Sequence, residues 1–117
     1  QPTSPLMNSN DLDRGIEKYS KTKADSLFSS YKAKYYIWKK NKKKLISFTY
    51  NHKKRTGTNK FKDLIVENGA YFIFKTKKFL KTKNRLFGKI ETYVMPKYRS
   101  FEIDYNEDIE FLKKLKF

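Results

Sequence analysis

The chain has 117 residues, no cysteine and a formal net charge of +16. This length predicts a single domain, and the lack of cysteine excludes disulfides and thiolate metal sites and favours a cytoplasmic location. The polar stretch 1–13 shows no secretory signal pattern and no apolar run reaches the length of a membrane span, so no membrane partner is expected.

The positive charge has two explanations. One is a polyanionic partner, such as nucleic acid, an anionic membrane surface or a phosphorylated small molecule. The other is compositional drift, because Lys, Asn, Phe, Tyr and Ile are all abundant and the lysines are scattered almost evenly along the chain. Net charge by itself indicates solubility and non-specific attraction, so the sequence predicts no specific nucleic-acid partner.

The start of the chain predicts one helix and one strand. Residues 10–21 place apolar side chains at i, i+4 and i+7, which is typical of an amphipathic helix, and Asn8 or Ser9 can cap its start. Residues 26–31 are β-like, and Leu27-Phe28 is expected to be buried in this strand.

Two aromatic segments, 35–38 and 45–50, predict a β-hairpin with its turn at 39–44. Basic and aromatic residues interleave here, which a single-stranded nucleic-acid binder would use for phosphate contacts and base stacking. A half-buried hairpin with one apolar face and one lysine face explains the same alternation, and we favour it. Residues 51–62 predict a loop, in which His52 is expected to be solvated.

The second half predicts two further strands and two further helices. Asn68-Gly69 is expected to form a tight turn into a strand at 70–74 that is buried on both faces. A helix is then expected at 77–83, a strand at 90–95 and a final helix at 106–116. This order of elements places the chain in the α/β or α+β class.

Residues 100–105 predict one more short strand, which carries two carboxylates into the final helix. Side chains alternate along a strand, so Glu102 and Asp104 are expected on one face. Two neighbouring carboxylates repel each other unless a cation or other donors lie between them, and Mg²⁺ favours such oxygen ligands. For an isolated Glu-x-Asp, a solvated strand edge is the alternative. Asp104 with Glu107 also fits a capping box.

Four spaced segments resemble the C-terminal half of the acylneuraminate cytidylyltransferases, the CMP-sialic acid synthetase family. They are Gln1-Pro2-Thr3-Ser4-Pro5-Leu6, Ala24-Asp25-Ser26, Glu67-Asn68-Gly69-Ala70 with the apolar strand after it, and Met95-Pro96 followed by Ser100-Phe101-Glu102-Ile103-Asp104. Their order and spacing fit along essentially the whole chain. Arg85-Leu86-Phe87-Gly88-Lys89 is similar to a variant in members that act on bacterial surface sugars.

The resemblance implies a three-layer α/β nucleotidyltransferase fold and a homodimer with a dimerisation arm at about residues 31–63. It also implies transfer of CMP from CTP to an acidic keto-sugar such as sialic, legionaminic or pseudaminic acid, with release of pyrophosphate, for surface polysaccharide synthesis. Mg²⁺ would be held by Glu102 and Asp104, where the family carries Asp-x-Asp.

The resemblance further assigns a substrate site. Gln1 matches a glutamine near the sugar, Asn68 and Gly69 match the start of the strand beside it, and Phe72 stands where the family often has a tyrosine. The family's sugar-binding Arg-Gln pair falls on Thr58-Asn59, so Arg55 is the expected substitute. Arg85 completes the expected substrate-binding set.

The family's Gly- and Lys-rich triphosphate loop lies in its N-terminal half, and the four separated glycines of this chain form no such loop. Because the chain starts in mid-motif at Gln1, we expect it to be N-terminally incomplete and inactive on CTP by itself. The alternative function is a small basic single-stranded nucleic-acid-binding module that uses Tyr35, Trp38 and the surrounding lysines.

Overall fold

The protein is described by a computed structural model that covers residues 1–115. In chain order its elements are α1 (Ser9–Thr22), β1 (Ser26–Ala33), β2 (Trp38–Asn41), β3 (Lys44–Ser47), β4 (Leu64–Phe74), α2 (Thr76–Thr82), β5 (Ile90–Val94) and α3 (Asn106–Lys114). This confirms the expected mixture of helices and strands. The chain divides into unit 1, which holds residues 1–31 and the chain from 66 on, and unit 2, which holds 32–65. Within the described residues, no helix is both long and apolar enough to cross a membrane.

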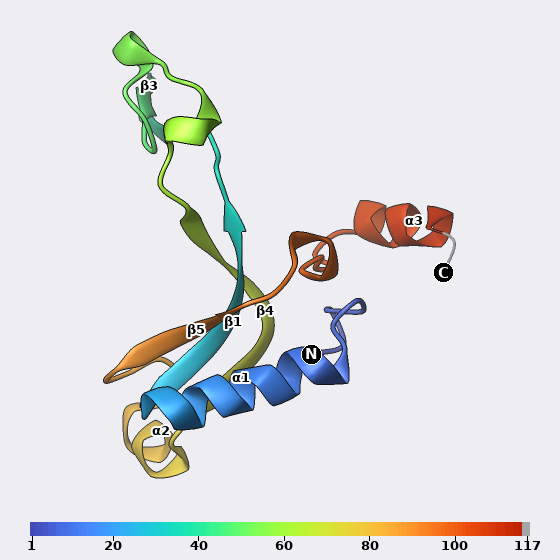
Figure 1. The fold of residues 1–117 in the computed structure, drawn as a ribbon. Coiled ribbons are helices and arrows are strands. Elements are labelled where there is room, and N and C mark those ends of the chain that lie inside the picture. Colours follow the sequence, from blue (N-terminus) through green and yellow to red (C-terminus); the bar gives the residue numbers. More distant parts are fainter. Residues whose placement is uncertain (116–117) are drawn as a thin grey trace. The chain divides into compact units, whose positions relative to one another are not determined.

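Unit 1 is built on a three-stranded sheet in the order β4-β1-β5 (Figure 1). β1 and β5 are parallel, with Ser26 opposite Ile90, and β4 runs back along the other side of β1, so the sheet is mixed. The buried apolar core is small and consists of Leu27, Ala70, Tyr71 and Met95. So small a core leaves much of the stability of unit 1 to polar contacts between its elements.

Helix α1 begins as its sequence predicts and lies close to β4. Asn8 caps it, because its side-chain oxygen accepts from the Asp11 amide at 3.0 Å and the Asp11 carboxylate accepts from the Asn8 amide at 3.2 Å. A Cβ at Gly15 would overlap the Tyr71 hydroxyl, which donates to the Asp11 carbonyl oxygen at 2.8 Å. Gly15 weakens the helix locally but allows the Tyr71 ring to approach it.

A buried ion pair joins α1 to the segment that precedes the last helix. Asp11 is fully buried, and Arg99 donates to its two oxygens from Nη2 at 2.7 Å and from Nε at 2.9 Å. Burial opposes ionisation of Asp11, but the hydrogen bonds from Arg99 and the Asn8 amide hold its pKa below the ordinary 3.8. The ionised pair therefore stabilises the fold above pH 3.8, and this contribution is lost as the pH falls through the lowered pKa.

Replacing Arg99 by alanine should destabilise the protein strongly at neutral pH. The change leaves the Asp11 carboxylate buried without its cation, which costs roughly 3–5 kcal/mol in comparable sites. Lys21→Ala is the control, because Lys21 is an exposed basic residue of α1 that is not among the charges acting on Asp11. Urea unfolding followed by circular dichroism measures both variants, and equal midpoints for the two would contradict the role given to the pair.

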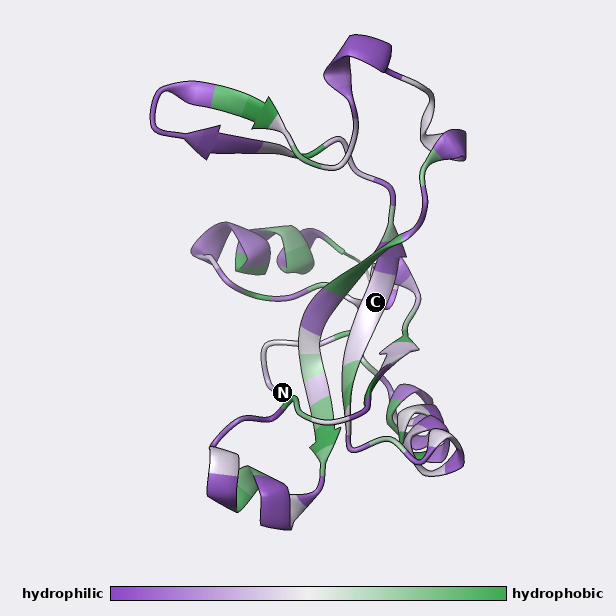
Figure 2. Ribbon diagram, turned by 90° about the vertical axis from the view of Figure 1, so that its left-hand side faces the viewer, coloured by the Kyte–Doolittle hydropathy of each residue, from purple (hydrophilic) through white to green (hydrophobic). Residues whose placement is uncertain are grey.

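Unit 2 contains the predicted hairpin, but its strands are shifted toward the turn. β2 and β3 pair antiparallel from Trp38 opposite Ser47 to Asn41 opposite Lys44, so the turn is shorter than the predicted 39–44. Beyond Trp38 the Phe48 amide still donates to the Ile37 carbonyl oxygen at 2.8 Å, but the Ile37 amide donates to the Thr49 hydroxyl at 2.9 Å and not to the opposite backbone. Figure 2 shows that β2 is hydrophilic whereas β3 carries apolar residues.

The aromatic residues of unit 2 pack mainly on one another. The Tyr36 ring makes edge contacts with Tyr50 and Phe61, with centroids 4.8 and 4.7 Å apart, and the Trp38 ring lies 5.9 Å from Tyr50. His52 is exposed, as predicted, but its Nδ1 also lies 2.9 Å from the Ser47 hydroxyl. These ring contacts form the interior of a unit that has no fully buried side chain apart from Ala33.

Three predictions for unit 1 are wrong. The strand predicted at 70–74 begins at Leu64, so Gly69 lies inside it and not before it. Residues 101–104 form no strand, because the Ile103 amide pairs with the Thr3 carbonyl oxygen in an irregular loop. The predicted capping box of Asp104 with Glu107 is replaced by one at Asp108, because α3 starts at Asn106 and Asp108 is its third residue. The Asp108 carboxylate accepts from the backbone amides of Asp104 and Tyr105. The predicted helix end at residue 116 lies outside the described residues.

Candidate functional site

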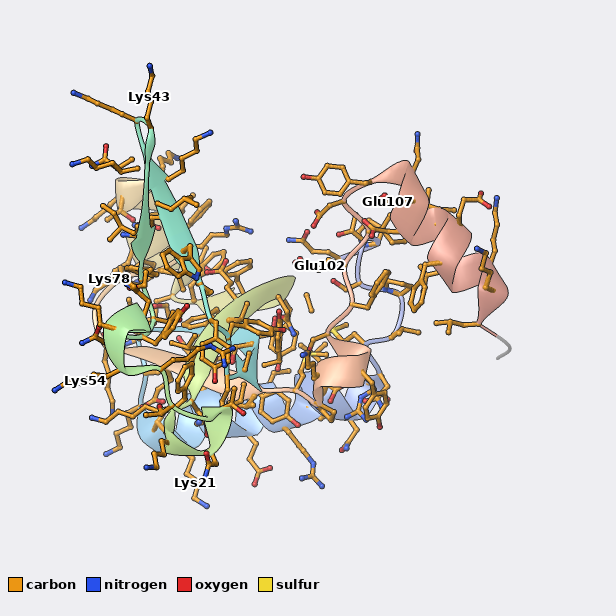
Figure 3. All side chains as sticks on the ribbon, turned by 90° about the horizontal axis from the view of Figure 1, so that it is seen from above. Lys21, Lys43, Lys54, Lys78, Glu102 and Glu107 are labelled. Atoms are coloured by element: carbon orange, nitrogen blue, oxygen red, sulfur yellow. The ribbon has the colours of Figure 1, made fainter. Side chains whose placement is uncertain are left out.

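Five carboxylates line one open cleft of about 1050 Å³ in unit 1. They are Glu67 from β4, Glu102 and Asp104 from the loop before α3, and Glu107 and Asp108 from its first turn. Figure 3 shows Glu102 and Glu107 along this stretch of the chain. Leu6, Val66, Phe101, Phe111 and Leu115 supply apolar walls. Lys97 is the one basic residue among the described residues that line it, so a chain of net charge +16 gathers a mostly acidic cleft, which favours a cationic ligand or a metal ion.

The Glu102 carboxylate lies directly against Gly69. Gly69 has a φ of +61°, and a Cβ at this position would overlap Glu102 Oε1. Burial raises the pKa of Glu102, and the nearby charges of Asp104 and Glu67 raise it further. Glu102 is thus the inner member of a group of three mutually repelling carboxylates, and a bound cation would relieve that repulsion.

Asn68 is buried behind the cleft and connects three segments of the chain. Its Oδ1 accepts from the Ser29 hydroxyl at 2.6 Å, and its Nδ2 donates to the Ser100 hydroxyl at 2.9 Å and lies 3.4 Å from the Met95 sulfur. Ser100 comes two residues before Glu102, so the Asn68 amide fixes where the loop with the two acids leaves the sheet.

The first residues of the chain close one side of the same region. The Gln1 backbone nitrogen donates to the Ala70 carbonyl oxygen at 2.9 Å, and the Ile103 amide donates to the Thr3 carbonyl oxygen at 2.9 Å. The structure therefore brings together two sets of predicted site residues. One is the sugar-binding set Gln1, Asn68 and Gly69, and the other is the Mg²⁺-binding pair Glu102 and Asp104.

Three predicted substrate-binding residues lie elsewhere. Phe72 and Arg85 stack on each other, with the guanidinium carbon 3.9 Å from the ring centroid, and neither lines the cleft. Arg55 belongs to unit 2, where its guanidinium lies 3.9 Å above the Tyr36 ring. Each arginine is held by a cation–π contact in the described structure.

The Ala24-Asp25-Ser26 segment also lies outside the cleft, at the start of β1. Asp25 accepts from Lys75 Nζ at 2.8 Å and from the Lys89 amide at 2.8 Å. The hydrogen bond from Lys75 is the main reason why the pKa of Asp25 is lowered. The described contacts give this segment a structural role, in which it fixes the chain around α2 and β5 to β1.

The cleft offers the ligands that a hard cation prefers, but not a complete set. Glu102 and Asp104 supply carboxylate oxygens, and Mg²⁺ commonly binds one or two carboxylates and completes its shell with water and substrate phosphates. No group of three or more Asp, Glu, His or Cys side chains within residues 1–115 is arranged to hold an ion by itself. The donor set thus fits a metal ion that a phosphate substrate helps to hold.

Comparisons with known proteins add no further assignment. No protein-family model matches the chain, and no curated protein matches it significantly.

Sequence reasoning did not identify Glu67 as a site residue or the Asp11–Arg99 pair that supports the site. Glu67 stands two residues before Gly69, so strand alternation, once β4 is known to begin at Leu64, places it on the same face as the glycine that contacts Glu102. Asp11 and Arg99 are 88 residues apart, and no local pattern in the sequence connects them.

Replacing Gly69 by alanine should destabilise the protein, for two separable reasons. The left-handed backbone costs a residue with a Cβ about 1–2 kcal/mol, and the new methyl group also displaces the Glu102 carboxylate. Gly57→Ala is the control, because Gly57 has a φ of −66° in an exposed loop. Urea unfolding should show a loss for Gly69→Ala only.

A second variant separates the two causes. In a Glu102→Ala background the overlap is gone and the backbone strain remains, so the effect of Gly69→Ala should become smaller without vanishing. An unchanged effect would show that Glu102 does not occupy the space beside Gly69.

The stability of the protein should depend on pH through Glu102. Because the folded-state pKa is raised above 4.5, ionised Glu102 destabilises the fold, and the free energy of unfolding should rise as the pH falls from 7 through the raised pKa toward 4.5. Glu102→Gln removes this dependence and should be more stable than the unmodified protein at pH 7. Urea midpoints across this range measure the effect, with Glu17→Gln, an exposed acid on α1, as the control. If both variants follow the same pH profile, the burial of Glu102 is contradicted.

Proposed function

We propose that the chain is the C-terminal part of a cytidylyltransferase, which transfers CMP from CTP to an acidic keto-sugar in the cytoplasm. The observation that carries the proposal is the convergence of three of the four family-like segments on one acidic cleft. Residues 67–70 and 100–104 contact each other there through Asn68 and Ser100 and through Gly69 and Glu102. Residues 1–4 join them through the backbone bonds of Gln1 to Ala70 and of Ile103 to Thr3. A three-layer nucleotidyltransferase fold and a homodimer formed through residues 31–63 belong to the same proposal.

The reaction requires little covalent chemistry from the protein. The anomeric hydroxyl oxygen of the sugar forms a bond to the α-phosphorus of CTP, and the bond from that phosphorus to the bridging oxygen breaks. Pyrophosphate leaves with the bonding electrons, and the hydroxyl proton passes to solvent water. A bound Mg²⁺ would neutralise negative charge that develops on the phosphates. Glu102 and Asp104 would hold it, and Gly69 allows Glu102 to approach β4 closely.

The acidity of the cleft also limits what it can bind directly. A sugar carboxylate would be repelled by Glu67, Glu102 and Asp104, so the substrate acid must be bound by a cationic residue outside this group. Arg55 and Arg85 are the proposed candidates, and each would have to leave its present aromatic partner to reach a substrate.

The alternative, a single-stranded nucleic-acid-binding module, has weaker support. Base stacking needs aromatic faces that are open to solvent, whereas Tyr36, Tyr50 and Phe61 contact one another. Trp38 is 41% exposed, but its ring packs on Tyr50 and His52. This alternative also gives no reason for an acidic cleft.

Metal binding tests the proposal without requiring turnover. Mn²⁺, a paramagnetic substitute for Mg²⁺, should broaden the NMR signals of residues 66–69 and 101–108 at low concentration, and added CTP should strengthen the effect. Asp104→Asn should weaken Mn²⁺ binding roughly tenfold or more, since even indirect partners of a metal ligand contribute that much. Asp13→Asn, which removes an exposed acid on α1, should leave binding unchanged. Uniform broadening of all acidic residues would contradict the site.

Activity is the decisive measurement. The longest protein encoded by the reading frame that contains these residues should form a CMP-sugar and pyrophosphate from CTP and an acidic keto-sugar in the presence of Mg²⁺. Asp104→Asn should abolish product formation, while Asp13→Asn retains it. Full activity of the Asp104→Asn variant would refute the metal assignment.

A further inference from the structure

The positive charge of the chain is concentrated in unit 2. Twelve lysine and arginine residues and a single acid, Asp63, lie within residues 32–65. The remaining acids all belong to unit 1, so the even spread of lysines along the sequence conceals an uneven distribution of net charge. Lys32 and Lys34 are the two basic residues near Asp63, at 3.4 and 3.9 Å, and both lie outside the hairpin.

The β2–β3 hairpin combines this charge with exposed apolar side chains. The exposed fractions are 67% for Leu45, 48% for Ile46 and 58% for Phe48. Each of the two β3 residues stands opposite a lysine, Leu45 opposite Lys40 and Ile46 opposite Lys39. The end of the hairpin adds more charge, and Figure 3 shows the Lys43 side chain extending away from it. Successive strand residues point to opposite faces, so each face of the hairpin carries an aliphatic side chain beside a lysine, and the expected division into one apolar face and one lysine face is wrong.

We propose that the β2–β3 hairpin binds the surface of an anionic lipid membrane. The exposed apolar side chains would enter the boundary between headgroups and acyl chains, and the neighbouring lysines would reach lipid phosphates. Lysine is suited to this arrangement because its alkyl stem lies along apolar surface while its ammonium group stays in the polar layer. In the free hairpin the Lys39 ammonium lies 3.8 Å above the Phe48 ring in a cation–π contact.

The other possible occupants fit the hairpin less well. Nucleic acid would need open aromatic faces, but the Lys39 ammonium lies over the exposed Phe48 ring and the Trp38 ring packs on Tyr50 and His52. Leu45, the most exposed apolar residue of the hairpin, is aliphatic and gives bases nothing to stack on. Packing of the hairpin on the same hairpin of a second copy would bring two strongly positive units together at a cost in repulsion. An anionic lipid surface satisfies the charge and the apolar groups at once.

This inference goes beyond the proposed enzyme and does not depend on it. The sequence predicted no membrane partner because no segment is long enough to span a bilayer. Binding at the interface needs no spanning segment, only exposed apolar groups beside basic ones.

The single tryptophan of the chain reports directly on the proposed contact. Trp38 lies at the start of β2 with 41% of its surface exposed. Vesicles of phosphatidylcholine with about one third phosphatidylglycerol should shift its fluorescence to shorter wavelength, and brominated acyl chains should quench it. Vesicles of phosphatidylcholine alone should bind at least tenfold more weakly, since each lysine near an anionic surface contributes about fivefold to partitioning.

Two sets of variants of the full chain test which surface binds. Leu45→Ser with Ile46→Ser should lower partitioning on anionic vesicles at least tenfold, since both side chains lose their apolar contact. Leu80→Ser is the control, because Leu80 is 58% exposed and stands among lysines on α2. Glutamine at Lys42, Lys43 and Lys44 should weaken binding much more than glutamine at Lys77, Lys81 and Lys83. Circular dichroism confirms that each variant is folded.

Three outcomes would overturn the proposal. If Leu80→Ser lowers vesicle binding as much as Leu45→Ser with Ile46→Ser does, the contact with the membrane lies on unit 1. If vesicles cause no fluorescence shift, and the protein is a dimer that Leu45→Ser with Ile46→Ser dissociates, the hairpin binds a second copy of the chain. If vesicles cause no fluorescence shift, and the protein binds oligonucleotides in a way that Trp38→Ala abolishes, the partner of the hairpin is nucleic acid.

Discussion

The buried side-chain amide of Asn68 is the contact on which the arrangement of unit 1 depends. An amide can accept on one side and donate on the other, and Asn68 does both, to Ser29 on β1 and to Ser100 before the acidic loop. The buried apolar cluster of unit 1 is small, so hydrophobic contacts alone cannot fix that loop. The polar network therefore determines where Glu102 and Asp104 lie, and the fold and the candidate site share one cause.

An acidic cleft can exist on a strongly basic chain because electrostatic interactions are short-ranged in salt solution. Charges more than about 8–10 Å apart are largely screened at physiological ionic strength, so the potential inside the cleft reflects Glu67, Glu102 and Asp104 more than the distant lysines. The same reasoning applies to unit 2, where basic residues dominate their own surroundings. The positive net charge of the sequence therefore describes unit 2 but not the cleft.

Local signals in the sequence predicted α1, α2 and β5 to within a residue or two, because caps and apolar periodicity depend only on neighbours in the chain. The beginning of β4 and the irregular loop at 101–104 were missed, since both depend on which distant backbone groups pair. For the site, the pair of Glu102 and Asp104 is predicted by the local sequence of residues 100–105 alone. Glu67, and the Asp11–Arg99 pair that supports the region, become visible only when segments far apart in the sequence meet.

Unit 2 leaves the sheet on β1 and returns on its neighbour β4, so the two ends of the inserted segment are adjacent in space. An insertion of this kind acts on the rest of the fold mainly through the entropy of closing a loop, which changes only slowly with its length. Residues 32–65 can therefore be lengthened, shortened or exchanged in evolution while the Asn68 network stays intact. The binding surface of the hairpin can therefore change without any change in the residues that form the cleft.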